Sequence, residues 1–272
     1  MPELPEVETI KRDLERIVLG KKITKVCVYN STVIREPSPA VFKKSLEGLV
    51  VKKILRRAKL LILELSNGSA LTIHLKMTGQ LVLRRSSSNS GGFKNSRVAF
   101  HLSAGKILDF NDQRLFGELR LIKDWKKLKF VQGLGPEPFD LTYGDFRDML
   151  SKKKTKIKPL LMDQSFISGI GNLYAAEILF RAKIDPWRSA QSLTEEEKKG
   201  LYKEIKEVLA SAITHGGSSV DDYVRLSGQR GDYRRFHRVY GRQAQPCFIC
   251  KGLIRRITQG GRGTYFCPKC QK

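Results

Sequence analysis

The amino-acid sequence predicts an α+β protein with a mostly β first part, a mainly helical second part and a metal-binding hairpin after it. Up to residue 122, segments alternate or run apolar between Asn-Gly and Ala-Gly turns, which is typical of antiparallel sheet. From residue 141, apolar residues recur at helical spacing. Two Cys-x-x-Cys pairs follow. With 272 residues, 40% of them hydrophobic, the chain is long enough for about two domain cores.

The first part is expected to begin with a helix followed directly by strands. Val7, Ile10, Leu14 and Ile17 fall on one helical face, and Gly20 is a suitable stop. Strand patterns then occupy residues 22–30, 59–68, 69–83, 97–110 and 117–122. The serine- and glycine-rich stretch at residues 86–92 is expected to be a flexible loop within this sheet.

The second part begins after a stretch rich in glycine and proline. The sequence GLGPEPFD at residues 133–140 indicates a linker, and helical patterns follow it up to residue 213. We therefore predict an N-terminal β domain at residues 1–132, the linker at 133–140, a helical domain at 141–235 and a module with the cysteine pairs at 236–272. We find no internal repeat.

Charge indicates the partner. The chain has 51 Lys and Arg against 27 Asp and Glu, a formal net charge of +24, which favours a polyanion as ligand. No apolar run approaches the roughly 18 residues that would span a bilayer. The first residues are acidic and proline-rich, unlike a signal peptide. We expect a cytoplasmic monomer with no membrane partner.

The strongest local signal is a metal site formed by Cys247, Cys250, Cys267 and Cys270. Sixteen residues separate the two Cys-x-x-Cys pairs, a spacing typical of a four-thiolate zinc site. Each pair supplies two thiolates from one knuckle, and the residues between are long enough for a hairpin that completes tetrahedral geometry. Because four protein ligands leave no position for water, we expect one structural Zn²⁺. A redox pair or two disulfides are the alternatives, which a cytoplasmic setting disfavours.

Basic residues concentrate around this hairpin. Between residues 225 and 262 there are ten Arg and Lys residues against one acid, Asp232. A charge run is often only a solvated face, but on a zinc hairpin in so basic a chain it favours nucleic acid. Upstream, Asn172 follows Gly169-Ile170-Gly171 and precedes an apolar helical run, so it is expected to be the N-cap of a helix. The free N–H groups of such a helix terminus suit a phosphate.

The first peptide, MPELPEVET, indicates chemistry. Pro5 and Glu6 suit the first turn of a helix through the fixed φ of proline and the helix dipole. Neither effect explains Pro2 or Glu3. Once Met1 is removed, Pro2 presents a secondary amine, and its attack on a sugar C1′ forms an iminium ion that makes neighbouring C–H bonds acidic.

Five motifs in order along the chain resemble one known family. These are PELPEVE at the start, RRAKLL at residues 56–61, DQRLFG at 112–117, MDQSFISGIGNLYAAE at 162–177 and GGRGTYFCPKCQ at 260–271. Together they resemble formamidopyrimidine-DNA glycosylase, the bacterial base-excision repair enzyme for 8-oxoguanine. The resemblance implies an N-terminal β-sandwich with its N-terminal helix, a helical domain with a helix-two-turn-helix motif, and a four-cysteine zinc-finger hairpin. It also implies a glycosylase and AP lyase that binds double-stranded DNA containing oxidised bases or abasic sites and flips the damaged base out of the duplex.

The resemblance also assigns catalytic roles. Pro2 is the nucleophile that forms the Schiff base, and Glu3 is the acid and base for the departing group. Lys59 transfers a proton during β-elimination and contacts nearby phosphates. Arg262 serves the second, δ-elimination. An adjacent amine and carboxylate need no organic cofactor for this chemistry.

Further residues match DNA contacts of the family. Met77, Arg114 and Phe116 correspond to side chains wedged into the space left by the flipped nucleotide, although each alone is an ordinary loop or core residue. His74, Lys153 and Asn172 match phosphate contacts. Residues 220–233 are expected to form a flexible loop over the flipped base.

Two departures from the family pattern affect contacts and not chemistry. Asn95 stands where the family often has a histidine that touches DNA, and Leu115 replaces a second basic residue after Arg114.

Two alternatives remain. A sister class acts on oxidised pyrimidines but begins Pro-Glu-Gly-Pro, so Leu4 favours the purine enzyme. A non-catalytic DNA-binding homologue is disfavoured by intact Pro2, Glu3 and Lys59.

Overall fold

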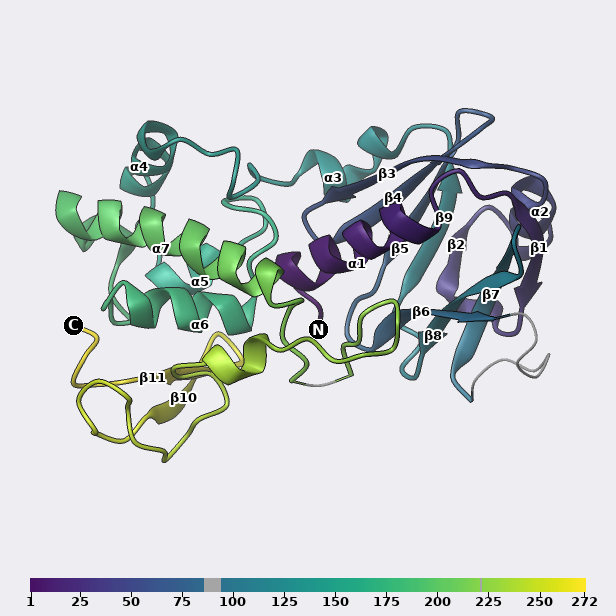
Figure 1. Ribbon diagram of the computed structural model, residues 1–272. Helices are drawn as coiled ribbons and strands as arrows, with labels where there is room; N and C mark the ends of the chain where they lie inside the picture. The colour runs from purple at the N-terminus through teal and green to yellow at the C-terminus, as the bar shows by residue number, and fades with distance from the viewer. Residues whose placement is uncertain (86–93, 221) are drawn as a thin grey trace. The chain divides into compact units, whose positions relative to one another are not determined.

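The structure is a computed structural model of residues 1–272, in which residues 1–85, 94–220 and 222–272 are described. In this part of the chain the fold divides into two compact units (Figure 1). The first unit contains Met1–Gln132 together with His215–Asp232, and the second contains Gly133–Thr214 and Tyr233–Lys272. The flexible loop expected at 86–92 lies outside the described residues. The division adds a segment to the first unit that the chain order alone assigns to the helical part.

The first unit is mostly β, as the apolar alternation predicts. Its elements are α1 (Leu4–Ile17), β1 (Ile23–Val28), η1 (Ser31–Val33), β2 (Ile34–Glu36), α2 (Pro39–Leu46), β3 (Val51–Arg57), β4 (Leu60–Leu65), β5 (Ala70–His74), β6 (Gly79–Arg85), β7 (Ser96–Leu102), β8 (Lys106–Asp112), β9 (Glu118–Ile122), η2 (Trp125–Lys127) and α3 (Lys129–Gln132).

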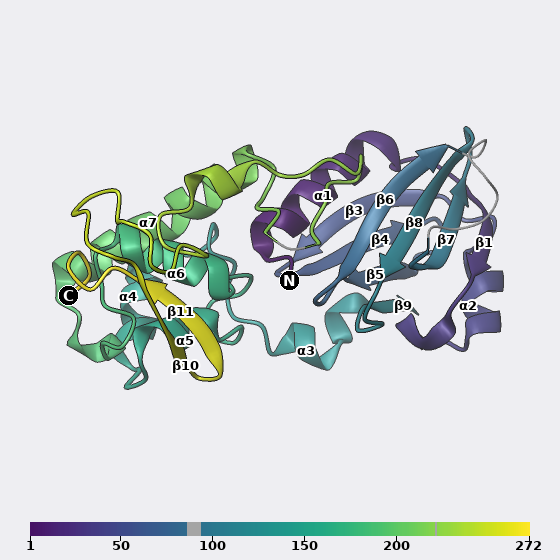
Figure 2. The ribbon, with the colours of Figure 1, turned by 90° about the horizontal axis from the view of Figure 1, so that it is seen from below.

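These strands form a β-sandwich, confirming the expected fold. Among the described residues, one sheet has the order β1-β7-β8-β6 and the other β2-β9-β5-β4-β3, with one apolar core between them (Figure 2). Neighbouring strands are antiparallel except β2 and β9, which run parallel. The expectation of a wholly antiparallel sheet is therefore wrong at this edge. β2 has only three residues and no alternation that the sequence could reveal.

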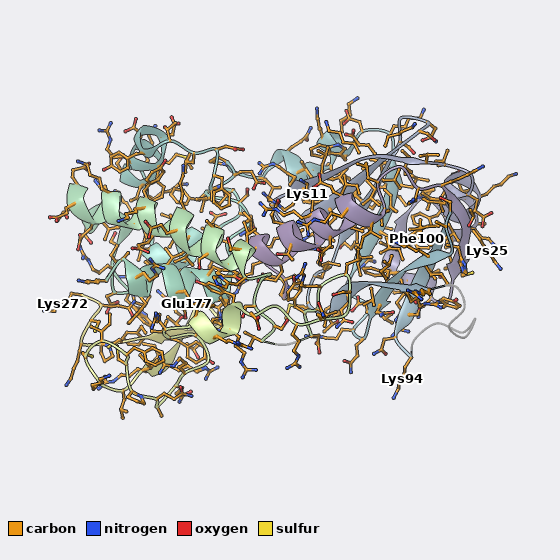
Figure 3. The ribbon with its side chains drawn as sticks, viewed as in Figure 1. Lys11, Lys25, Lys94, Phe100, Glu177 and Lys272 are labelled. Atoms are coloured by element: carbon orange, nitrogen blue, oxygen red, sulfur yellow. The ribbon has the colours of Figure 1, made fainter. Side chains whose placement is uncertain are left out.

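The predicted N-terminal helix is confirmed as α1. Val7, Ile10 and Leu14 are fully buried in the sandwich core, where α1 packs against β3 and β4. Phe100 lies inside the first unit in Figure 3, and its ring lies 6.4 Å from that of Phe42. The apolar face of α1 thus anchors the N-terminal peptide to the sheet that carries Lys59.

Two elements of this unit had no clear sequence signal. In β3 a register shift between Val51 and Lys53 interrupts the alternation of inward and outward side chains. The sequence of this strand therefore shows several basic residues and no regular apolar alternation. Helix α2 is eight residues long and buries only Phe42 and Leu46. A single apolar pair four residues apart is too short a pattern to predict a helix.

The second unit is mainly helical. Its elements are α4 (Tyr143–Ser151), α5 (Ile157–Met162), α6 (Asn172–Arg181), η3 (Ala190–Ser192), α7 (Glu195–Thr214), η4 (Tyr233–Phe236), β10 (Arg255–Gln259) and β11 (Arg262–Phe266). Strands β10 and β11 form the expected hairpin, and β11 contacts α6 (Figure 1). No helix in the described part of the chain has the length and apolar character needed to cross a bilayer.

A small core joins the cysteine module to α6. Ala176 and Phe180 of α6 pack with Val239, Ile254 and the buried cysteines. Lys272 marks the surface at the far end of this unit in Figure 3, whereas Glu177 of α6 lies inside it. The module is therefore mounted on the same helix whose N-terminus is expected to meet phosphate.

Candidate functional site

Glu6 holds the N-terminal peptide in place. Pro2 is buried and Glu3 is 4% exposed. The Glu3 N–H donates to Glu6 Oε2 at 2.8 Å, and the Ser218 N–H donates to Glu6 Oε1 at 2.8 Å. A Cβ at Gly217, where φ is +78°, would lie 2.9 Å from Glu6 Oε1, so only glycine allows this approach. The dipole explanation of Glu6 is thus incomplete, because its carboxylate also fixes a segment 212 residues away.

Lys59 lies in the tight turn between β3 and β4. Ala58 before it has a φ of +51°, and Lys59 itself is 8% exposed. Arg56 supports the turn: its Nη1 donates to the Ala58 carbonyl at 3.0 Å and its Nε to Glu8 on α1 at 2.9 Å. Burial of Glu8 opposes ionisation, but hydrogen bonds from Arg56 and Arg12 outweigh it and lower the pKa of Glu8. The helix of the N-terminal peptide and the turn of Lys59 are therefore joined by one ion pair.

Three exposed side chains occupy two neighbouring loops of the first unit. Met77 follows β5 and is 42% exposed, and Phe116 precedes β9 and is 48% exposed. The Arg114 guanidinium stacks over the Phe116 ring, 4.7 Å from its centroid. Exposed apolar groups beside an arginine have the properties that a base-stack wedge requires.

His74 can act as a neutral donor. It accepts the Lys76 N–H at Nδ1 over 3.0 Å, which places its ring proton on Nε2. Burial, helped by the charge of Lys76, lowers the pKa of His74 to about 4. Asn95 is partly buried, and its carbonyl accepts the Asp112 N–H at 2.9 Å. The structure thus gives the main chain of Asn95 a structural role.

The loop expected over the base is attached to the first unit. Leu226 is fully buried in the sandwich core, and its carbonyl accepts the Leu83 N–H at 2.8 Å. Arg225 donates to both carboxylate oxygens of Asp13 on α1, at 2.8 and 3.3 Å. The part of this segment that the structure describes therefore has specific anchors on β6 and on α1.

Asn172 is the first residue of α6 and not its N-cap, which is Gly171. The expected capping role is wrong because its side chain is used elsewhere. Its Oδ1 accepts from Lys158 Nζ at 2.7 Å, and its Nδ2 donates to the Gly263 carbonyl at 3.0 Å. Lys158 is 1% exposed and also donates to Thr264 Oγ1 at 2.9 Å. These bonds fix the N-terminus of α6 against the hairpin.

The two turns before α6 are braced by one glutamine. Gln164 Nε2 donates to the carbonyls of Met162 and Ile170, at 2.9 and 2.8 Å, and its Oε1 accepts the Gly169 N–H at 2.9 Å. Gly169 has a φ of +93°, which favours glycine. The linker contacts this structure, since the Gly135 N–H donates to the Gln164 carbonyl at 2.8 Å.

The four cysteines converge as the sequence predicts. Their sulfur atoms lie within 4.8 Å of one another, with Cys247–Cys270 at 3.9 Å and Cys250–Cys267 at 3.4 Å. Tetrahedral zinc with Zn–S bonds of about 2.3 Å places sulfur atoms about 3.8 Å apart, so the site fits one structural Zn²⁺. A hydrogen bond from Gly252 lowers the pKa of Cys250 to about 7, whereas burial raises the pKa of Cys267 and of Cys270.

The remaining expected site residues lie on the surface of the second unit. Arg262 is exposed at the start of β11, after a turn whose Gly260 and Gly261 both have positive φ. Lys153 is exposed just beyond α4. The sequence missed Glu6, Lys158 and Gln164 as supporting residues, because their partners are remote in sequence or are backbone groups.

The sandwich, the helical unit and the zinc hairpin, with their exposed basic residues, define a zinc-containing DNA-binding protein. Family models match residues 1–119 as the formamidopyrimidine-DNA glycosylase N-terminal domain, 134–224 as its H2TH domain and 244–272 as the zinc finger found in FPG and IleRS. The formamidopyrimidine-DNA glycosylase of Desulforamulus reducens is 42% identical over 277 residues, covering 100% of this chain and 99% of the relative.

Solved structures agree with this match. A Lactococcus lactis FPG mutant in complex with a Fapy-dG containing DNA has a TM-score of 0.92, 35% identity and full coverage of both chains. The MutM (FPG) protein of Thermus thermophilus has a TM-score of 0.88 and 38% identity, covering 99% of this chain and 98% of that one. The chain belongs to the formamidopyrimidine-DNA glycosylase family.

Proposed function

We propose that this chain is a bifunctional DNA glycosylase and AP lyase that removes oxidised purines from double-stranded DNA during base-excision repair. The observation that carries the proposal is the buried Pro2-Glu3 dipeptide, which Glu6 holds at the start of α1. The Lactococcus lactis relatives supply the substrate class, since they are bound to DNA containing Fapy-dG or an abasic site. An amine nucleophile and a carboxylate at one chain end fit this reaction.

Base removal begins at Pro2. After Met1 is cleaved, the lone pair of the Pro2 nitrogen attacks C1′ of the damaged nucleotide. The glycosidic bond breaks, and its electron pair leaves with the base, which takes up a proton. Glu3 supplies that proton or the one that the sugar oxygen O4′ takes up. Loss of the nitrogen proton leaves a neutral N,O-acetal, and when its C1′–O4′ bond breaks, O4′ leaves as a hydroxyl and the nitrogen lone pair forms the C1′=N⁺ iminium ion. The Glu3 carboxylate must therefore lie close to the departing base and to the sugar oxygen, as its adjacency to Pro2 allows.

Strand cleavage follows from the iminium. Because the cation acidifies the C2′ hydrogen, a base can remove it and expel the 3′ phosphate, with electrons moving toward the nitrogen. We assign proton transfer in this β-elimination to Lys59 and assist in the second, δ-elimination to Arg262. The turn held by Arg56 restricts where Lys59 can reach. Water then hydrolyses the final iminium ion, which releases the sugar remnant as an aldehyde and regenerates the Pro2 amine.

The DNA-binding residues follow the same logic. We propose that Met77, Arg114 and Phe116 fill the space of the flipped nucleotide, and that three residues contact phosphate: His74, Lys153 and Asn172. Asn172 does so through its backbone N–H, since its side chain is bonded to Lys158 and Gly263. Asn95 is proposed as a weaker contact. The zinc ion holds the hairpin that carries Arg262.

Borohydride trapping tests the catalytic proposal. A duplex with one 8-oxoguanine opposite cytosine is incubated with protein and reductant. The wild type should form a covalent adduct and nick the strand, whereas Pro2→Gly should do neither at a comparable rate and should keep its duplex affinity. Pro39→Ala, at the exposed N-terminus of α2, is the matched control and should trap normally. A large, uniform loss of binding in Pro2→Gly would contradict a catalytic role.

Lesion choice separates the alternatives. An adduct that forms only with thymine glycol would support the pyrimidine-specific sister class. No adduct on any lesion, with normal duplex binding, would support a non-catalytic homologue. We further propose that the enzyme works as a monomer on DNA in the bacterial cytoplasm, with working domains at 1–132, 141–235 and 236–272. The bacterial relatives support that location.

A further inference from the structure

One buried aspartate connects the two loops that carry Met77, Arg114 and Phe116. Asp112 is the last residue of β8 and has no solvent exposure. Its backbone is fixed on both sides, because its N–H donates to the Asn95 carbonyl at 2.9 Å and its carbonyl accepts from Arg97 Nε at 2.7 Å. The Asp112 carboxylate is therefore a rigid point at the end of β8, where the second loop begins and where Gly79, at the end of the first loop, pairs with Asp112.

Three donors from the two loops meet this carboxylate. In the loop after β5, the Thr78 hydroxyl donates to Oδ1 at 2.5 Å. In the loop after β8, the Arg114 N–H donates to Oδ1 at 3.2 Å and the Gly117 N–H to Oδ2 at 2.6 Å. The Arg114 N–H is also 3.2 Å from Thr78 Oγ1, so the loops contact each other directly as well.

Both loops contain strained backbone, and the second also has a close backbone approach, so they depend on contacts that fix their conformation. A Cβ at Gly117 would lie 2.5 Å from the Phe110 ring and 2.9 Å from Asp112 Oδ2. Lys76 and Leu115, which adjoin the three exposed side chains, have φ values of +52° and +58°. Non-glycine residues in this region are strained and persist where the surrounding contacts fix them.

We propose that Asp112 is a positioning residue that couples the two loops, so that Met77, Arg114 and Phe116 enter the base stack as one unit. This inference rests on the proposed function, because it assumes that these three side chains form the wedge. Asp112 acts through the loops and touches no DNA itself. Its negative charge suits this role, since each carboxylate oxygen is only an acceptor and all three loop groups are donors.

Asp112→Asn separates this role from packing. Asparagine has nearly the same shape, but its amide nitrogen is a donor and must face either the Arg114 N–H or the Gly117 N–H, which can only donate. Thr78→Val is a milder companion that removes one hydroxyl and leaves the aspartate in place. If Asp112→Asn does not fold, Thr78→Val still tests whether the first loop depends on this bond.

Amide hydrogen exchange tests the coupling without any enzymatic activity. In Asp112→Asn, peptides covering residues 75–79 and 113–117 should both exchange at least about tenfold faster, the factor expected for one lost hydrogen bond to a charged group. In Thr78→Val both should also exchange faster, by a smaller factor. Peptides from α1 should not change. Faster exchange in only one of the two loops would overturn the coupling, whatever the protein's activity.

A mutant cycle tests the link to base flipping. Single-turnover excision is measured for wild type, Asp112→Asn, a wedge-less Met77→Ala/Arg114→Ala/Phe116→Ala variant, and the combination. We expect Asp112→Asn to slow excision by about tenfold in the wild type and by less than about twofold in the wedge-less background. Equal factors in both backgrounds would overturn the positioning role. Wild type that forms no adduct would refute the proposed function instead, and the exchange result would stand apart from it.

Discussion

Glu177→Gln tests how the zinc module is held on α6. Glu177 is 1% exposed, and its carboxylate accepts three successive backbone N–H groups that precede the module. Oε2 accepts from Arg238 at 2.8 Å, and Oε1 accepts from Val239 and Tyr240 at 3.0 and 2.8 Å. Burial raises the pKa of Glu177, while the three N–H groups act in the opposite direction. Glu177 therefore fastens α6 to the backbone of residues 238–240, which lead into the cysteine module.

The size of the effect follows from these bonds. Glutamine keeps one carbonyl oxygen for Val239 and Tyr240, but its amide nitrogen faces the Arg238 N–H, so two buried donors oppose each other. Loss of one hydrogen bond to a charged group costs about 1.5–3 kcal/mol, and an unsatisfied buried donor costs about 1–3 kcal/mol. Because glutamine carries no charge, it recovers part of the desolvation penalty. We expect a net loss of about 2–4 kcal/mol.

Urea unfolding of the zinc-loaded protein measures this loss, and a chromogenic chelator follows release of the metal in parallel. Glu177→Gln should lower the unfolding midpoint and speed zinc release. Glu207→Gln, on the exposed face of α7, is the control and should cost no more than about 1 kcal/mol. A change below about 0.5 kcal/mol in Glu177→Gln, with unaltered zinc release, would refute the view that this carboxylate fastens the module.

Three further outcomes are expected. Chelating the zinc should unfold the hairpin and abolish duplex binding, as seen by circular dichroism and a gel-shift titration; normal binding by the metal-free protein would exclude the finger as a main contact. The pKa of buried His237 lies at about 4, mainly through burial. As the pH falls from 6.5 to 4, the imidazole of the unfolded chain therefore binds a proton, while that of the folded protein stays neutral. His237 should account for a loss of about 3 kcal/mol over that window, and His237→Gln should remove this share and leave the comparable loss from His74, while a substitution at the less buried His101 removes less. Leu226→Ala should cost about 2–5 kcal/mol in thermal unfolding and expose the 215–232 segment to protease, whereas the exposed Leu253→Ala should change stability by less than about 0.5 kcal/mol.

The sequence predicts the fold where one pattern is long and unbroken. Helix α1 shows its apolar face over several turns, and the paired cysteines specify their geometry by spacing alone. The prediction fails where the pattern is short or distorted. Strand β3 is bulged at Val51, β2 pairs in parallel over three residues, and α2 buries a single apolar pair. In each case long-range pairing decides the structure, and a local window does not contain it.

The candidate site divides in the same way. The residues proposed to do chemistry lie in recognisable motifs, so the sequence alone is enough to propose Pro2 and Lys59. The residues that support the candidate site are not found in this way, because their hydrogen bonds reach distant partners. Glu6 reaches Ser218, and Lys158 reaches Thr264. Nothing in the local sequence of a buried lysine or glutamate reveals such a partner, so three-dimensional structure is needed to identify the support of the site.

Peptide mapping by mass spectrometry of the borohydride-reduced adduct tests the central claim most directly. We expect the deoxyribose remnant on the nitrogen of Pro2, in a peptide that lacks Met1. A remnant on a lysine side chain, or full activity in protein that retains its initiator methionine, would contradict the account.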